Sequence, residues 1–171
     1  RLGTKSPSSL LWREGKEMIY TGVTKDPIDP MAVLDRVGAD AHGAALLFLG
    51  VVRNNADGRS VSGMTYEAYQ EMATPVLGDI ASEVVTLCGT DQVVVVHRVG
   101  ELAIGEVSVA IAVSSPHRAE AYEASRYVIE EIKKRLPIWK KEHYTDGTDK
   151  WVEGMKPVSP DRAGTLAERP V

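Results

Sequence analysis

The sequence predicts an α+β protein with a mixed, largely antiparallel sheet, several hairpins and two to three packed helices. Three observations favour this class. Strand-like and helix-like segments are intermixed along the chain. Asp-Gly pairs at 57–58 and 146–147 stand between strand-like segments, which is typical of hairpins. Apolar residues recur at helical spacing in the stripe Ala121, Ala124, Val128, Ile132 and Leu136.

The N-terminal part begins with residues 1–16, which are rich in Ser, Gly and Lys and which we expect to form a flexible lead-in. A weak alternation of apolar residues then predicts a strand over 17–24. A helix should follow, because Asp29 suits the N-cap position and Pro30 the first helical position. We expect this helix to stop near Gly38.

A nearly continuous apolar run at 43–53 predicts a buried central strand. Residues 61–69 predict a second strand. Because the Asp57-Gly58 turn lies between them, we expect these two strands to pair as a hairpin. A helix should follow over 71–87, with Pro75 in its first turn, where proline does little harm.

The next two strands are predicted at 92–97 and 106–113. Ser115-Pro116 then opens the longest helix. We end this helix at Leu136, because Pro137 disfavours helical geometry in the residue before it.

The C-terminal part contains a predicted hairpin, in which 138–144 pairs with 150–152 around Asp146-Gly147. Beyond it the chain is polar and rich in Pro. We therefore expect one domain over 17–153 and a polar tail over 154–171, since 171 residues are enough for one hydrophobic core and few for two.

Composition excludes several function classes. The net charge of −4 argues against a general nucleic-acid binder, so any anion site must be local. No apolar run is long enough to span a membrane, and we expect a soluble, cytoplasmic protein. The single cysteine, Cys88, cannot form an internal disulfide, fits a reducing compartment, and lies in an apolar helical stretch as a buried structural thiol. Four scattered histidines predict no metal site.

His117 and Arg118 are the first candidate site residues. They stand at the start of the longest predicted helix, where the partial positive charge of the helix end usually attracts acids. Positive side chains are unfavourable there unless an anion lies among them, as in phosphate sites. Alternatively, both side chains point to solvent or to a neighbouring carboxylate.

A second candidate is the basic cluster at 133–135 and 140–141, which spans a helix end, a proline break and a strand. Crowded cations lower a lysine pKa and make it a better nucleophile or base. Alternatively, these bases only complement the negative end of the helix. Arg53, at the end of the apolar strand, is a third candidate. Alternatively, Arg53 pairs with an acid. We interpret His97, which closes another buried strand, as a structural residue.

In combination, six segments resemble the family of molybdopterin synthase catalytic subunits. They occur in family order and together span most of 17–153, and none is specific alone. They are GAALLFLGVVRNN (43–55), TYEAY (65–69), VVVVHRVGEL (93–102), VSSPHRAEAYEA (113–124), KKRLPIWKKE (133–142) and KWVEG (150–154).

The resemblance implies an α/β-hammerhead-like fold and a sulfur transfer that converts cyclic pyranopterin monophosphate into molybdopterin, a dithiolene. Two sulfurs would come from the thiocarboxylate on the C-terminal Gly-Gly of a small ubiquitin-like subunit. The chain would form a homodimer and, with two small subunits, a heterotetramer. This chemistry requires no metal or organic cofactor.

The resemblance also assigns site residues. Lys133 and Lys140 match the two catalytic lysines. Arg53, Phe48 and the pair His117 and Arg118 match substrate-binding residues, and the pair would reach the pocket of the neighbouring protomer.

Two departures from the family pattern, Ile129 and Val51, would alter the pocket without removing a reacting group. Two other functions remain open at this point. One is a non-enzymatic module that binds a ubiquitin-like tail or a phosphorylated metabolite. The other is a small RNA-binding protein that uses the basic cluster, which the acidic net charge disfavours.

Overall fold

The computed structural model describes residues 18–152, so the predicted lead-in over 1–16 and tail over 154–171 lie outside the described part. Helices and strands alternate irregularly along the chain, as expected for an α+β fold. In chain order, the elements are β1 (Met18–Thr24), α1 (Pro30–Leu34), β2 (Ala44–Val51), β3 (Asn55–Ala56), β4 (Arg59–Ala68), α2 (Gln70–Cys88), β5 (Gln92–Arg98), β6 (Gly100–Ala103), β7 (Val107–Ser115), α3 (Arg118–Arg135), β8 (Ile138–Tyr144) and β9 (Asp149–Val152).

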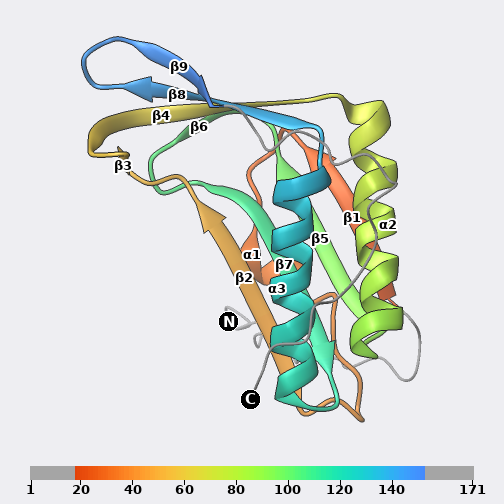
Figure 1. Ribbon diagram of the computed structural model, residues 1–171. Helices are drawn as coiled ribbons and strands as arrows, with labels where there is room; N and C mark the ends of the chain where they lie inside the picture. Colours follow the sequence, from red (N-terminus) through yellow and green to blue (C-terminus); the bar gives the residue numbers. More distant parts are fainter. Residues whose placement is uncertain (1–17, 153–171) are drawn as a thin grey trace, which may run out of the picture.

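The main sheet has the strand order β1-β5-β7-β2. β1 runs parallel to β5, whereas β5 with β7 and β7 with β2 are antiparallel. Helices α2 and α3 lie side by side on one face of this sheet, and the short α1 lies on the other (Figure 1). Two of the sheet's strands are therefore buried on both faces, which explains why β5 and β7 read as apolar runs rather than as alternating segments.

The hydrophobic core is divided by the main sheet, because successive side chains of a strand point to opposite faces. Beneath α2 and α3, Val93, Val95 and Ile111 are fully buried against Leu77 and other helix residues. On the opposite face, Val94, Ala110 and Ala112 pack against Val33 and Val37 at α1.

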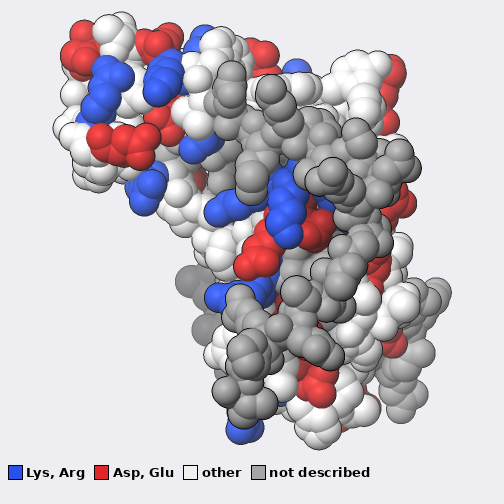
Figure 2. Space-filling model, in the orientation of Figure 1, with Lys and Arg blue, Asp and Glu red and all other residues white. Residues whose placement is uncertain are grey.

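The second sheet has the order β3-β4-β8-β9, with β6 paired to β4. It extends as an arm from the end of the helical layer (Figure 1). The predicted hairpin around Asp146-Gly147 is confirmed: β8 and β9 are antiparallel neighbours, and Gly147 takes a positive φ of 82°. In Figure 2, basic and acidic side chains are interleaved over this arm on the face shown.

The predicted hairpin between 43–53 and 61–69 is wrong. β2 pairs with β7 in the main sheet, whereas β4 pairs with β3, β6 and β8 in the arm. The turn at Asp57-Gly58 does form, and both residues adopt positive φ, but it joins β4 to the two-residue strand β3. A register shift between Gly50 and Val51 precedes the last pair of β2, Val51 with Val107, and Val52 then donates to the carbonyl of Glu106.

Three further differences concern element bounds. α1 ends at Leu34, so it is shorter than expected. Beyond it, Arg36 and Val37 donate backbone hydrogen bonds to the carbonyl groups three residues earlier, as in a 3₁₀ turn. The strand β6 is absent from the sequence-based prediction. α3 begins at Arg118 with His117 as its N-cap, while Ser115 still belongs to β7. The helix predicted over 71–87 is confirmed as α2.

Two predictions about single residues are also confirmed. Cys88 is a buried free thiol, 6% exposed, and burial raises its pKa. His97 is buried, and its Nδ1 lies 2.9 Å from the carbonyl oxygen of Arg98, so this nitrogen carries the hydrogen. No helix within 18–152 is long and apolar enough to cross a membrane.

Candidate active site

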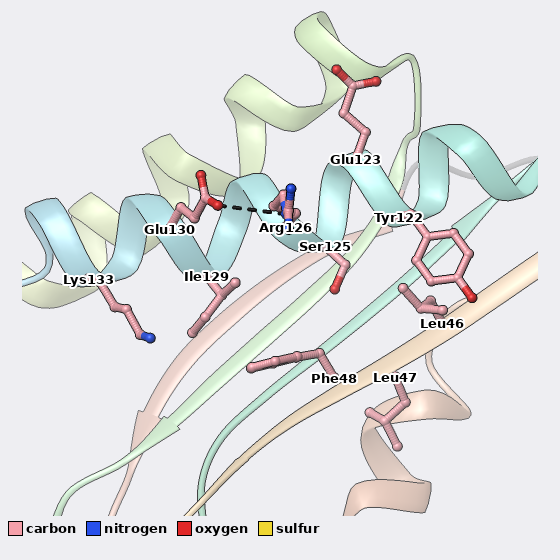
Figure 3. Close-up of a pocket in the computed structure, with 10 residues that line it drawn as sticks. All are labelled: Leu46, Leu47, Phe48, Tyr122, Glu123, Ser125, Arg126, Ile129, Glu130 and Lys133. Carbon is pink, nitrogen blue, oxygen red and sulfur yellow. Dashed lines mark ion pairs between the residues drawn. The ribbon is translucent and has the colours of Figure 1, made fainter.

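An open groove of about 870 Å³ runs between α3 and β2. In Figure 3, Phe48 of β2 and Ile129 of α3 point toward one another across it, and Lys133 extends from the same side of the helix as Ile129. The groove is lined by Leu46, Leu47, Phe48, Tyr122, Glu123, Ser125, Arg126, Ile129, Glu130 and Lys133.

Helical periodicity explains which α3 side chains reach this groove. Tyr122, Ser125, Ile129 and Lys133 follow one another at intervals of three or four residues, so they form one stripe along the helix. Lys133 is the last member of the stripe and stands at the C-terminal end of the helix. The position predicted to face the pocket, Ile129, therefore lies in the groove as expected.

The bases around Lys133 are held by acids. Lys134 Nζ donates to Glu131 at 2.9 Å, and this hydrogen bond raises the pKa of Lys134. Arg135 donates to Glu83 of α2 at 2.6 Å and to Glu131 at 3.4 Å. Glu130, one residue before Glu131, pairs with Arg126 instead. Lys134 and Arg135 thus form ion pairs on the helix surface.

Lys133 differs from its neighbours. It is exposed, and within residues 18–152 it has no ion-pair partner. A lysine ammonium beside the apolar side chains of Phe48 and Ile129 is available to an anionic ligand or to a reacting group. The structure therefore brings two of the predicted site residues, Lys133 and Phe48, to one groove.

Lys140 lies on β8, beyond the break at Pro137, and does not line the groove. Its side chain is 39% exposed, and its Nζ lies 3.3 Å from Oε1 of the buried Glu142. Its neighbour Lys141 places its ammonium 5.3 Å from the ring centroid of Trp151. Sequence reasoning missed Glu142, although it stands two residues after Lys140 and therefore on the same face of the strand.

His117 and Arg118 are exposed at the N-terminal end of α3. His117 makes no side-chain hydrogen bond to the helix end that it caps. An acid also stands at this helix end, because Glu120 occupies the first turn, with its Oε2 buried and without a hydrogen-bond partner in the described part of the chain. A helix rises about 1.5 Å per residue, so the sixteen residues from His117 to Lys133 correspond to about 24 Å.

Arg53 is exposed just after β2, next to the buried Val52. Val52 is tied to the end of β6 and the start of β7 by backbone hydrogen bonds with Glu106 and Gly105. Arg53 therefore leaves the main sheet where the arm begins, and it does not line the groove. Among the described residues, no group of three or more His, Cys, Asp or Glu is placed to hold a metal ion.

These features together define a class of protein: an α+β domain with a partly apolar groove that ends at a lysine without an ion-pair partner among residues 18–152, and with basic residues at the opposite end of the same helix. Such a site suits an enzyme that acts on an anionic organic substrate.

Comparisons with known proteins agree with this class. Residues 23–135 match a family described as MoaE protein. The molybdopterin synthase catalytic subunit of Halalkalibacterium halodurans is 45% identical over 130 residues, which are 76% of this chain and 83% of that protein. The crystal structure of molybdopterin synthase from Staphylococcus aureus has a TM-score of 0.71 and 39% identity, and covers 77% of this chain and 95% of that chain.

A third likeness concerns the fold alone. A structure from Helicobacter pylori, described as a protein–protein complex of subunits 1 and 2 of molybdopterin-converting factor, has a TM-score of 0.65 at 21% identity. The alignment covers 86% of this chain and 99% of that one. The chain belongs to the MoaE family. The family resemblance predicted from the sequence and the α+β fold class are therefore confirmed.

Proposed function

We propose that this chain is the catalytic subunit of a molybdopterin synthase and acts on cyclic pyranopterin monophosphate. Membership of the MoaE family supports this assignment. The observation that carries it is Lys133, an exposed lysine without an acidic partner in the described part of the chain, at the end of an apolar groove.

The sulfur donor is, in this proposal, the C-terminal Gly-Gly thiocarboxylate of a small ubiquitin-like subunit. A glycine tail has no side chains, so it fits an open groove with apolar walls such as that between Phe48 and Ile129. Each transfer forms a carbon–sulfur bond on the substrate and breaks one of its carbon–oxygen bonds, and the displaced oxygen leaves as water. Hydrolysis then breaks the carbon–sulfur bond of the former thiocarboxylate. Water supplies the oxygen that leaves the donor as a carboxylate, so the exchange needs no oxidant and no metal or organic cofactor.

Lys133 is proposed to stand nearest the reacting carbon, as proton-transfer catalyst, covalent amine or stabiliser of the developing negative charge. Lys140 is proposed to supply a second positive charge that either polarises the leaving oxygen or tunes Lys133. Arg53, His117 and Arg118 are proposed to bind the phosphate, and Phe48 to pack against the substrate.

The substrate-binding pair and Lys133 lie at opposite ends of α3, about 24 Å apart by helical rise. One small pterin cannot contact both ends in one copy. We therefore propose a homodimer with two-fold symmetry, in which His117 and Arg118 serve the groove of the partner protomer. With two small subunits the assembly is a heterotetramer. The single free Cys88 supports a reducing, cytoplasmic location.

The experiment mixes the chain with its thiocarboxylated partner and the cyclic pterin phosphate, and detects by mass spectrometry a product that has gained two sulfurs. Lys133→Ala should abolish turnover and leave partner binding nearly intact. Lys134→Ala is the matched control, because Lys134 is engaged by Glu131 on the helix surface. Partner binding without any sulfur gain by the native chain would favour the binding module instead.

A further inference from the structure

Three residues of β8 that point to the same side form a connected chain of polar contacts. The Tyr144 hydroxyl donates to Glu142 Oε2 at 2.7 Å, and Lys140 Nζ donates to Glu142 Oε1 at 3.3 Å. The three residues are spaced by two, so they share one face of the strand. One carboxylate therefore uses one oxygen for the tyrosine and the other for the lysine.

The carboxylate of Glu142 is buried, so its oxygens require hydrogen-bond donors. Glu142 is 5% exposed and Tyr144 is 6% exposed, whereas the Lys140 side chain is 39% exposed and reaches solvent. A buried carboxylate is costly unless donors satisfy its oxygens. Because Tyr144 supplies one of those donors, the carboxylate can stay buried with its second oxygen turned to Lys140.

The ring of Tyr144 is held by contacts separate from the hydrogen bond of its hydroxyl group. The Arg59 guanidinium lies 3.4 Å from the centroid of the Tyr144 ring, and Arg59 also donates to Asp146 at 2.9 Å and to Thr148 at 2.8 Å. The ring further packs with Ala56 and Val61 in a small cluster of the arm. The hydrogen bond to Glu142, together with burial, raises the pKa of Tyr144, so the phenol remains a donor at neutral pH.

We propose that Tyr144 is a positioning residue for Lys140 and acts on it through the buried carboxylate of Glu142. The inference rests on the proposed function, in which Lys140 is catalytic, and it adds two residues that the family resemblance did not assign. Loss of the Tyr144 hydroxyl leaves Glu142 Oε2 without its donor. The carboxylate then turns toward water and releases the ammonium of Lys140 from its fixed position.

The first test observes the contact directly. Side-chain ammonium signals are recorded by NMR on the full chain with ¹⁵N-labelled lysine, and the signal of Lys140 is assigned by its loss in Lys140→Arg. In Tyr144→Phe, the Lys140 signal should move to the position of a freely rotating lysine. Tyr127→Phe is the matched control, because Tyr127 donates to a different carboxylate, Glu83, at the same distance of 2.7 Å.

The second test is kinetic and uses the complex with the thiocarboxylated partner. Tyr144→Phe should lower kcat about tenfold with the KM for the pterin unchanged, the size of effect expected for one lost hydrogen bond of about 1.4 kcal/mol. Glu142→Gln should lower kcat at least as much. Because the tyrosine acts through the carboxylate, the double variant should be no slower than Glu142→Gln alone.

The outcomes separate this inference from the proposed function. An unchanged Lys140 signal in Tyr144→Phe, or strictly additive losses in the double variant, would overturn the positioning role even if Lys140→Ala is inactive. A fully active Lys140→Ala enzyme would instead overturn the catalytic assignment, while the NMR spectra still show whether Tyr144 orders the lysine. A purely structural role of Tyr144 would lower the thermal midpoint and leave kcat unchanged.

Discussion

The rings of Tyr66 and His97 meet edge to face, with centroids 5.4 Å apart and an interplanar angle of 70°. This contact joins the two sheets, because Tyr66 belongs to β4 of the arm and His97 to β5 of the main sheet. Burial raises the pKa of Tyr66 and lowers the pKa of His97 to about 4. Both groups are therefore neutral at physiological pH, and this ring contact between the sheets is uncharged.

The first prediction concerns acid stability. His97 has a folded-state pKa of about 4 against an ordinary value of 6.5, so the unfolded chain binds this proton more readily. The free energy of unfolding should thus fall as the pH drops from 6.5 to 4, by roughly 3 kcal/mol from this group, and level off below. His97→Phe should remove this part of the pH dependence in urea unfolding at pH 7, 5.5 and 4.5. Parallel curves for both proteins would contradict the assignment.

The second prediction concerns the turn of the β8–β9 hairpin. Hydrogen bonds from the hydroxyl and backbone amide of Thr148, and then from Arg59, lower the pKa of Asp146 to about 2 from an ordinary 3.8. The stabilisation is complete above pH 3.8 and is lost as the pH falls toward 2. Asp146→Asn should therefore have a thermal midpoint that depends less on pH between 4 and 2 than that of the native chain. Asp79→Asn, on the exposed side of α2, serves as the control.

The third prediction concerns the core beneath α2. Leu77 is fully buried, so Leu77→Ala should lower the free energy of unfolding by roughly 2–5 kcal/mol through lost burial and a residual cavity. Leu87 is 55% exposed on the same helix, and Leu87→Ala should change stability by no more than about 0.5 kcal/mol. Urea unfolding of both variants measures the difference, and similar losses would mean that the packing of α2 is misplaced.

The fourth prediction tests the site shared between protomers. Lys133→Ala and Arg118→Ala should each be inactive, because every dimer of one variant lacks a residue in both sites. Random assembly of the two variants makes half of the dimers hybrids, and each hybrid has one complete site, so co-expression should restore about a quarter of native turnover. Absence of any recovery would show that both residues act within one protomer.

The sequence was most informative where a segment's own pattern decides its structure. The apolar stripe from Ala121 to Leu136 and the proline that follows it predict α3 nearly to the residue. Which strand pairs with which cannot be predicted from the local pattern, since pairing depends on contacts between segments far apart in the chain. The run at 43–53 carried no signal that it would pair with β7 rather than with 61–69.

The candidate site shows the same division. The family resemblance predicts a catalytic role for Lys133, and helical spacing explains why this lysine shares the groove with Ile129. The chain could not reveal that Arg135 also pairs with Glu83, because Glu83 lies on another helix, about fifty residues away. Tyr144 was likewise inconspicuous, since its importance arises from the burial of Glu142 and from the cover provided by Arg59.

Lys140 and Lys141 are adjacent on β8, and they differ because successive side chains of a strand point to opposite faces. Lys140 faces the buried carboxylate and Lys141 faces the indole of Trp151. Deleting Pro137 would shift β8 by one residue, so that Lys141 would take the buried face now occupied by Lys140. Glu142 and Tyr144, which follow on the same strand, would then point outward, so that lysine would lack its carboxylate. The length of the break after α3 thus decides which face each residue of β8 occupies.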